Sequence, residues 1–260
     1  MIVFKYMPPK HVCQALANGE LLARPPQELN DPYELHFRLK PCSPVDVLRA
    51  LNTDSRIRRR LIEYGKVPAA LPPKKLREAA VKICKKMEDE REDILEIPKR
   101  PARLVCFAGT HDSLLMWSHY AAAHTGVVLE FDATEWLIAP RPMRYSRDLP
   151  EFDFLAEDAE MLSAIDDIVL TKSRSWRYEQ ESRLVLDGKT ETRERVVVGK
   201  RMDFWPFPRE SLKRVRVGAR CEIANQIVEA LYGLKEYSAV VVEQASLHET
   251  RYEVRFDPLS

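Results

Sequence analysis

Hydrophobic residues recur along the chain with two different spacings, and each spacing predicts a different kind of element. Short apolar or alternating runs are typical of strands, and they lie at 2–6, 103–107, 127–131, 182–186, 195–198, 212–217, 239–243 and 252–256. Apolar residues three or four positions apart predict helices at 11–18, 113–123, 153–171 and 223–232. Because strands and helices alternate irregularly, the pattern favours an α+β fold with mixed, mainly antiparallel sheets and flanking helices.

A polar helical stretch between residues 45 and 96 departs from this pattern. Apolar positions in 47–62 form one amphipathic face, those in 76–87 form a second, and prolines between them separate the two helices. Two basic clusters fall on these helices, and a charge run on a helix is more typical of a solvated face than of a nucleic-acid patch. We therefore expect a single domain, residues 1–260, with a helical insertion or cap near residues 45–96.

Composition and charge narrow the function classes. Lys plus Arg number 41 and Asp plus Glu number 40, so the net charge of +1 does not favour nucleic-acid binding through bulk charge. The chain has no apolar run long enough to span a membrane, no secretory signal pattern and no CxxC pair among its five cysteines. We expect a cytoplasmic protein with reduced thiols and no membrane association, and the oligomeric state stays open.

The common catalytic and metal-binding motifs are absent from the sequence. It contains no GxGxxG, P-loop, HExxH or GxSxG motif. No His, Cys or Asp residues stand at a clear metal-ligand spacing, so we predict no metal site.

The first candidate constellation is the aromatic run at residues 114–121. On a helix, Trp117, Tyr120 and Ala121 share one side, and aromatic residues at that spacing usually pack in a core. The alternative is that Ser118, His119 and Tyr120 point into a cleft and bind a polar ligand.

The second constellation lies at residues 172–183. If the chain is extended from residue 178 onward, Glu179, Glu181 and Arg183 share one face. Two carboxylates on one face raise the pKa of one of them, which suits acid–base chemistry. An equal alternative is a structural row in which Arg183 neutralises the carboxylates. The flanking Trp176 and Tyr178 supply the stacking surface of a ligand pocket, and this favours the functional interpretation.

The third constellation is the segment at residues 30–34. Asn30, Asp31 and Pro32 form a strong turn signal, because Asx side chains close turns and proline restricts φ. A tight turn is the simpler interpretation. The functional alternative is a loop that lines the same cleft, with Asp31 or Glu34 facing the ligand.

Taken in order along the chain, these motifs resemble the bacterial and phage family called domain of unknown function 2971. The resemblance rests on Lys5-Tyr6, 29–34, Cys106-Phe107, 116–121 with His124 and Gly126, 172 with 176–183, Val217-Gly218 and 252–256. It spans nearly the whole chain and constrains 45–96 least. Because relatives in this family are similar to abortive-infection proteins, the resemblance implies a link to phage defence.

A more distant similarity is to ADP-ribosyltransferases. Lys5, the group Ser118–Tyr120 and the triplet Glu179-Gln180-Glu181 follow the order of a basic residue, a Ser or Tyr, and an ExE motif in those enzymes. The chain departs from them in having Lys5 where Arg or His is expected and in lacking Ser-Thr-Ser. The similarity implies an NAD-consuming transferase or glycohydrolase, with NAD as cofactor and Glu181 as the catalytic carboxylate.

The residues predicted under this hypothesis fall into three roles. The catalytic group is Glu181, Glu179 and His119. The group that would hold NAD, or another small nucleotide, is Lys5, Tyr6, Ser118, Tyr120, Trp176, Tyr178 and Arg183. The group that would contact the substrate is Asn30, Asp31, Glu34, Trp117 and Lys172.

The alternative function is a non-catalytic binding or interaction module. It predicts that Trp117 and Trp176 are core residues, that the carboxylates are already paired with arginines, and that no deep pocket exists. The enzyme hypothesis instead predicts that Lys5, Tyr120, Trp176 and Glu181 converge on one cleft.

Overall fold

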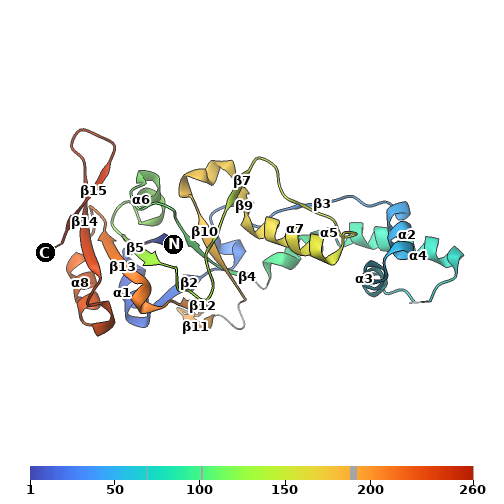
Figure 1. Ribbon diagram of the computed structural model, residues 1–260, viewed down its shortest axis with the longest axis horizontal. Helices are drawn as coiled ribbons and strands as arrows, with labels where there is room; N and C mark the ends of the chain where they lie inside the picture. Colours follow the sequence, from blue (N-terminus) through green and yellow to red (C-terminus); the bar gives the residue numbers. More distant parts are fainter. Residues whose placement is uncertain (69, 101, 188–191, 260) are drawn as a thin grey trace. The chain divides into compact units, whose positions relative to one another are not determined.

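The computed structural model describes residues 1–260 except positions 69, 101, 188–191 and 260, and its described residues confirm an α+β fold with mostly antiparallel sheets (Figure 1). The chain forms two compact units. The first, here the sheet unit, comprises Met1–Asn30, Pro101–Tyr145 and Lys172–Ser260. The second, here the helical unit, comprises Asp31–Arg100 and Ser146–Thr171.

A five-stranded sheet forms the centre of the sheet unit. Its strands, in spatial order, are β1 (Ile2–Met7), β5 (Val127–Asp132), β13 (Leu212–Val217), β14 (Val241–Leu247) and β15 (Val254–Pro258). Neighbouring strands are antiparallel except β13 and β14, which are parallel. Two helices contact each other beside this sheet, α1 (Pro9–Asn18) and α8 (Ala224–Tyr232). Leu16 and Ile227 from these helices are fully buried with Leu129 and Val215 from the sheet, so one hydrophobic core joins both layers.

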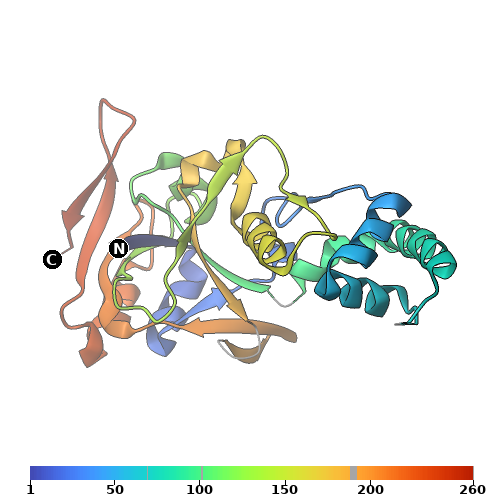
Figure 2. The same cartoon turned by 45° about the vertical axis from the view of Figure 1, so that its right-hand side comes forward.

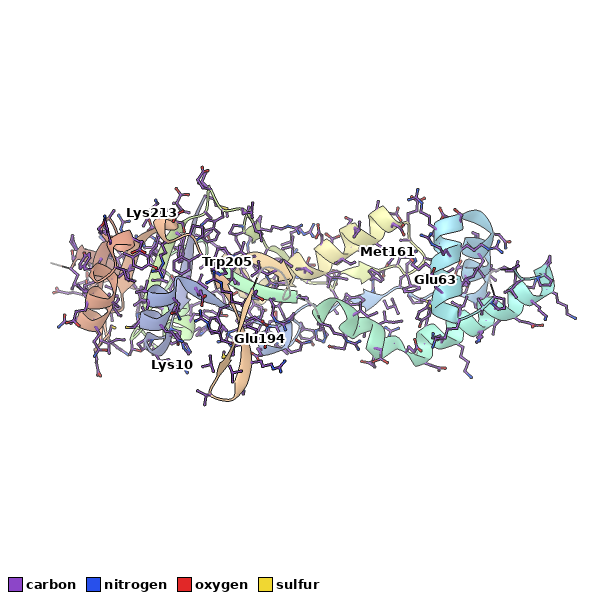
Figure 3. The ribbon with its side chains drawn as sticks, turned by 90° about the horizontal axis from the view of Figure 1, so that it is seen from below. Lys10, Glu63, Met161, Glu194, Trp205 and Lys213 are labelled. Carbon is purple, nitrogen blue, oxygen red and sulfur yellow. The ribbon has the colours of Figure 1, made fainter. Side chains whose placement is uncertain are left out.

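Two smaller sheets complete the sheet unit. One has the order β4 (Ala102–Phe107), β10 (Ser182–Asp187), β6 (Arg141–Pro142), and the other β11 (Arg193–Val197), β12 (Lys200–Pro206), β2 (Glu20–Ala23). Glu194 and Trp205 mark β11 and β12 in Figure 3. The Trp205 indole packs on Trp136 with ring centroids 4.9 Å apart, so the smaller sheet joins the same core. In the first sheet, Arg183 of β10 stands opposite Cys106 of β4.

Short elements carry the connections of the sheet unit. They are η1 (Pro26–Glu28), α6 (Leu114–Tyr120), η3 (Arg174–Glu179), η4 (Arg209–Ser211) and η5 (Lys235–Tyr237). Strands β7 (Arg144–Ser146) and β9 (Thr171–Ser173) lie where the chain passes between the units.

The helix expected at 113–123 is shorter than predicted, because α6 ends at Tyr120 and the next turns are left-handed. Ala122, Ala123 and His124 have φ values of 47°, 54° and 69°. Gly126 follows at a place where a Cβ atom would lie 2.0 Å from the Met7 carbonyl oxygen, so only glycine fits against β1.

The helical unit has its own core. Its elements are β3 (Arg38–Leu39), α2 (Pro44–Thr53), α3 (Ser55–Gly65), α4 (Pro73–Asp89), α5 (Arg91–Glu96), η2 (Ile97–Lys99), β8 (Glu151–Phe152) and α7 (Asp158–Leu170). Helices α2, α3 and α4 contact one another (Figure 2). The side chains of Val47, Leu61 and Ile83 are buried between them. Ser43 begins α2 with a capping box to Asp46, which satisfies two free donors at the helix start.

The helices predicted between 45 and 96 are therefore present, and β3 and β8 of the same unit pair in parallel. Within the described ranges, no helix is long and apolar enough to cross a membrane.

Candidate functional site

One buried lysine connects the two carboxylates of the second constellation. The Lys172 Nζ atom donates to Oε2 of Glu179 at 2.6 Å and to Oε2 of Glu181 at 2.8 Å. The three side chains are at most 9% exposed. A single ammonium group therefore bridges two carboxylates away from bulk water.

Two further side chains complete this arrangement. The Tyr120 hydroxyl donates to Oε1 of Glu179 at 2.5 Å, and Arg183 donates through Nε (2.9 Å) and Nη2 (2.8 Å) to Oε1 of Glu181. We call Tyr120, Glu179, Lys172, Glu181 and Arg183 the buried ionic network. Its two acids and two bases balance, and every carboxylate oxygen has a donor.

The backbone that presents the two glutamates differs from the predicted extended strand. Glu179 ends the 3-10 helix η3, Gln180 is left-handed with φ 46°, and β10 begins only at Ser182. The sharp turn at Gln180 brings both carboxylates onto Lys172. It also needs a glycine opposite, because a Cβ atom on Gly109 would lie 2.8 Å from Cβ of Gln180. Residues 178–181 are not extended, so the condition under which the two glutamates would share one strand face is not met, although the carboxylates do meet.

Residues from neighbouring strands hold the network in place. The Tyr145 hydroxyl accepts a hydrogen bond from the Glu181 backbone N–H at 2.7 Å. Lys5 Nζ donates to the Cys106 carbonyl at 2.8 Å, next to the Arg183 register position, and burial lowers the Lys5 pKa. Burial also raises the pKa of the Cys106 thiol to about 12, so this thiol stays protonated.

The pKa values of the two carboxyl groups of the network are shifted in opposite directions. Burial opposes ionisation of Glu181, but Arg183 and Lys172 outweigh it and lower its pKa to about 2. Burial raises the pKa of Glu179, with Lys172 and the Tyr120 hydroxyl acting in the opposite direction. Burial would lower the pKa of Lys172, yet the two carboxylates raise it, so the lysine remains a cation.

Aromatic rings surround the network. Lys172 Nζ lies 5.0 Å from the centroid of the Trp176 ring, and the ring centroids of Trp176 and Tyr178 are 6.1 Å apart. Nδ1 of His119 lies 3.1 Å from the Tyr178 hydroxyl. Trp176 and Tyr178 are half-buried and His119 is exposed. We call Trp176, Tyr178 and His119 the aromatic rim.

A cavity of about 370 Å³ is lined by Tyr145, Arg174 and Arg177. The two arginines stand three positions apart on η3, and side chains at that spacing lie one above the other on a 3-10 helix. Both side chains are exposed. The lining is therefore basic, whereas the acidic residues lie in the interior.

Two predicted residues, Tyr6 and Trp117, face the core instead of a cleft, whereas Ser118 is exposed on α6. Trp117 is fully buried, donates from Nε1 to the His111 carbonyl at 2.8 Å, and packs against the edge of Tyr6. The Tyr6 hydroxyl donates to the Thr110 carbonyl, and Ser118 Oγ donates to the Leu114 carbonyl. None of the contacts of Tyr6, Trp117 and Ser118 described here reaches the buried ionic network.

The third constellation divides between the two units. Asn30 belongs to the sheet unit, and its side chain lies near the Tyr120 hydroxyl. Asp31 and Glu34 belong to the helical unit, where Oδ1 of Asp31 accepts from the Tyr33 N–H at 2.9 Å. The Glu34 N–H donates to the Asp31 carbonyl, so this segment forms the predicted turn.

Sequence reasoning missed Tyr145, Arg174 and Arg177. Tyr145 lies far along the chain from the second constellation, and the pairing of β6 with β10 brings it close. The spacing of the arginines was visible, but it places them together only once residues 174–179 are known to form a 3-10 helix. In the described part of the chain, no three His, Cys, Asp or Glu residues gather as metal ligands.

Comparison with known proteins confirms the family resemblance over part of the chain. Residues 116–184 match the family described as "Protein of unknown function (DUF2971)". All five residues of the buried ionic network, the aromatic rim and the three cavity residues lie inside the matched segment. No curated protein and no solved structure matches the chain.

Proposed function

We propose that this chain, whose residues 116–184 match the DUF2971 family, is a binding module for a small molecule with a planar ring, with nucleotides as the ligand class. One observation carries the proposal. Lys172 and Arg183 already neutralise Glu179 and Glu181 in the interior. A balanced, buried set of ion pairs provides a rigid support and offers no open carboxylate to a substrate.

The aromatic rim is the part of this region that can meet a ligand. Lys172 fixes one side of Trp176, so the ring is oriented by the network before any ligand arrives. A pre-oriented aromatic side chain loses little conformational entropy when a planar group stacks on it. Nucleobases and nicotinamide are planar groups of this kind.

The test is a calorimetric titration of NAD, ATP and adenosine into the wild type and the Trp176→Ala variant. Because stacking on an aromatic side chain contributes about 1–3 kcal/mol per base, Trp176→Ala should bind at least about fivefold more weakly. Tyr252→Ala is the matched control, since Tyr252 is fully exposed in another part of the sheet unit. Equal affinity of Trp176→Ala and the wild type would contradict the proposal.

A second candidate is an NAD-consuming enzyme similar to ADP-ribosyltransferases. Two observations favour it. Lys5, Tyr120 and Trp176 all lie around the Lys172–Glu181 pair, and the pKa values of Glu179 and Glu181 are shifted in opposite directions. Environments that separate two carboxyl groups in this way are typical of acid–base pairs. Here a permanently charged Glu181 would stabilise an oxocarbenium-like state, with Glu179 assisting.

This candidate is tested by nicotinamide release from NAD. The enzyme hypothesis expects release by the wild type and a decrease of about 100-fold or more in Glu181→Gln, with folding of the variant checked by circular dichroism. Release that is equal in both proteins would exclude Glu181 as the catalytic residue. The link to phage defence rests on the family resemblance alone, and plaque counts on cells with and without the chain would test it.

A further inference from the structure

The cavity beside the buried ionic network has its own chemistry. We infer that Arg174, Arg177 and Tyr145 form a binding site for a phosphate group carried by a small soluble molecule. The inference deepens the proposed function, because it names the second half of the ligand. The aromatic rim would take the planar ring and this cavity would take the phosphate.

The two arginines have no acidic partner among the described residues. Arg174 and Arg177 are exposed, and within the described part of the chain no ion pair or side-chain hydrogen bond engages either guanidinium. A guanidinium group presents a planar fork of N–H donors that matches two phosphate oxygens. Two such forks stacked three residues apart on η3 can hold one phosphate or two linked phosphates between them.

Tyr145 supplies a neutral donor at the same cavity. Its hydroxyl oxygen accepts from the Glu181 N–H, so the hydroxyl proton is not used in that bond. Burial raises the pKa of Tyr145, which keeps the proton in place at neutral pH. Tyr120 differs here, because its proton is already donated to Glu179. The Tyr145 proton is therefore available to an anion in the cavity.

The charge balance around the cavity also favours an anion. The buried ionic network contains two acids and two bases, so its five members carry no net charge. Arg174 and Arg177 add two positive charges that no described acid compensates, and a phosphate monoester carries about −1.5 to −2 at neutral pH. The cavity of about 370 Å³ falls within the range of small-molecule pockets, roughly 300–1,000 Å³.

The test is a calorimetric titration of inorganic pyrophosphate into the purified full chain at low ionic strength. The Arg174→Gln/Arg177→Gln double variant should bind about 100-fold more weakly than the wild type, since each lost charge-assisted contact costs about tenfold. Tyr145→Phe should bind about threefold to tenfold more weakly, with a thermal melt to show that it remains folded. Arg251→Gln/Arg255→Gln is the matched control, because both arginines are exposed and lie outside the cavity, and it should stay within about twofold of the wild type.

Three outcomes would overturn the inference: no pyrophosphate binding by the wild type, equal binding by the Arg174→Gln/Arg177→Gln variant, or an equal loss in the control variant. A parallel titration of adenosine separates this inference from the proposed function. Binding of adenosine without pyrophosphate would support the aromatic rim and reject the phosphate site. Binding of pyrophosphate without adenosine, together with equal NAD and ATP affinities of the wild type and Trp176→Ala, would support the phosphate site and reject the proposed ring-binding function.

Discussion

Ion pairs in the sheet unit and in the helical unit have nearly the same geometry but very different surroundings. Lys172 lies 2.8 Å from Glu181, and Lys40 of the helical unit lies 2.8 Å from Asp153. The first two side chains are 9% and 3% exposed, whereas Lys40 and Asp153 are 53% and 32% exposed. Distance alone therefore does not distinguish the two pairs.

This difference in exposure determines which charged side chains can be removed without a loss of stability. Water screens an exposed pair and replaces a lost partner, so the pair contributes little to stability. A buried charge that loses its partner has no such replacement, and the penalty falls on the folded state. The buried ionic network should therefore set both the stability of the sheet unit and the position of the aromatic rim.

The largest expected effect comes from removing the central cation. Lys172→Met removes the cation that bridges Glu179 and Glu181 in the interior, and this should cost about 3–5 kcal/mol of unfolding free energy. Urea denaturation measures it. Lys40→Met is the matched control in the helical unit, and its urea midpoint should not change. Equal changes in the two variants would show that burial does not separate the two pairs.

A smaller effect is expected from acid. The pKa of Glu181 in the folded protein is about 2, below its ordinary value of 4.5. The contribution of ionised Glu181 to the unfolding free energy is therefore complete above pH 4.5 and is lost as the pH falls toward 2. The loss should be about 3 kcal/mol. Glu179 acts in the opposite direction, because burial raises its pKa and protonation relieves the buried charge.

Unfolding free energies measured in urea from pH 7 to pH 2 test this prediction. In the Glu181→Gln variant, the decrease in unfolding free energy that Glu181 causes between pH 4.5 and pH 2 should be absent. In the Glu179→Gln variant, this decrease should remain. A pH profile that is unchanged in Glu181→Gln would contradict the lowered pKa.

The smallest effect should come from the outer end of the network. Tyr120→Phe removes the donor to Oε1 of Glu179 and should cost about 1 kcal/mol, since Lys172 still neutralises the carboxylate. The unfolding free energy measures the cost. A loss as large as that of Lys172→Met would mean that the hydroxyl, rather than the ammonium group, stabilises Glu179.

Much of the fold was predictable because periodicity reports which faces are buried. Leu16, Leu129 and Val215 follow the expected spacings and lie in the core. The helix and strand ends were less predictable. The left-handed turn from Ala122 to His124 depends on the close approach of Gly126 to β1, a tertiary contact that no local pattern reveals.

The sequence also predicted part of the candidate site. Glu179, Glu181 and Arg183 were expected together, and they do meet, but through a left-handed Gln180 rather than an extended strand. For Trp117 the sequence allowed both a core position and a position in a cleft, because the spacing of aromatic residues on a helix does not show what they pack against. The structure places Trp117 in the core. Tyr145 enters the site only through strand pairing, which the sequence alone does not show.

The central claim is that the paired carboxylates support binding and do not turn over the ligand. A titration of NAD into the wild-type chain, with nicotinamide quantified in the same sample, tests it most directly. The account predicts saturable binding with no nicotinamide above the level of a protein-free control. Nicotinamide release by the wild type that is lost in Glu181→Gln would contradict it and make Glu181 a catalytic residue.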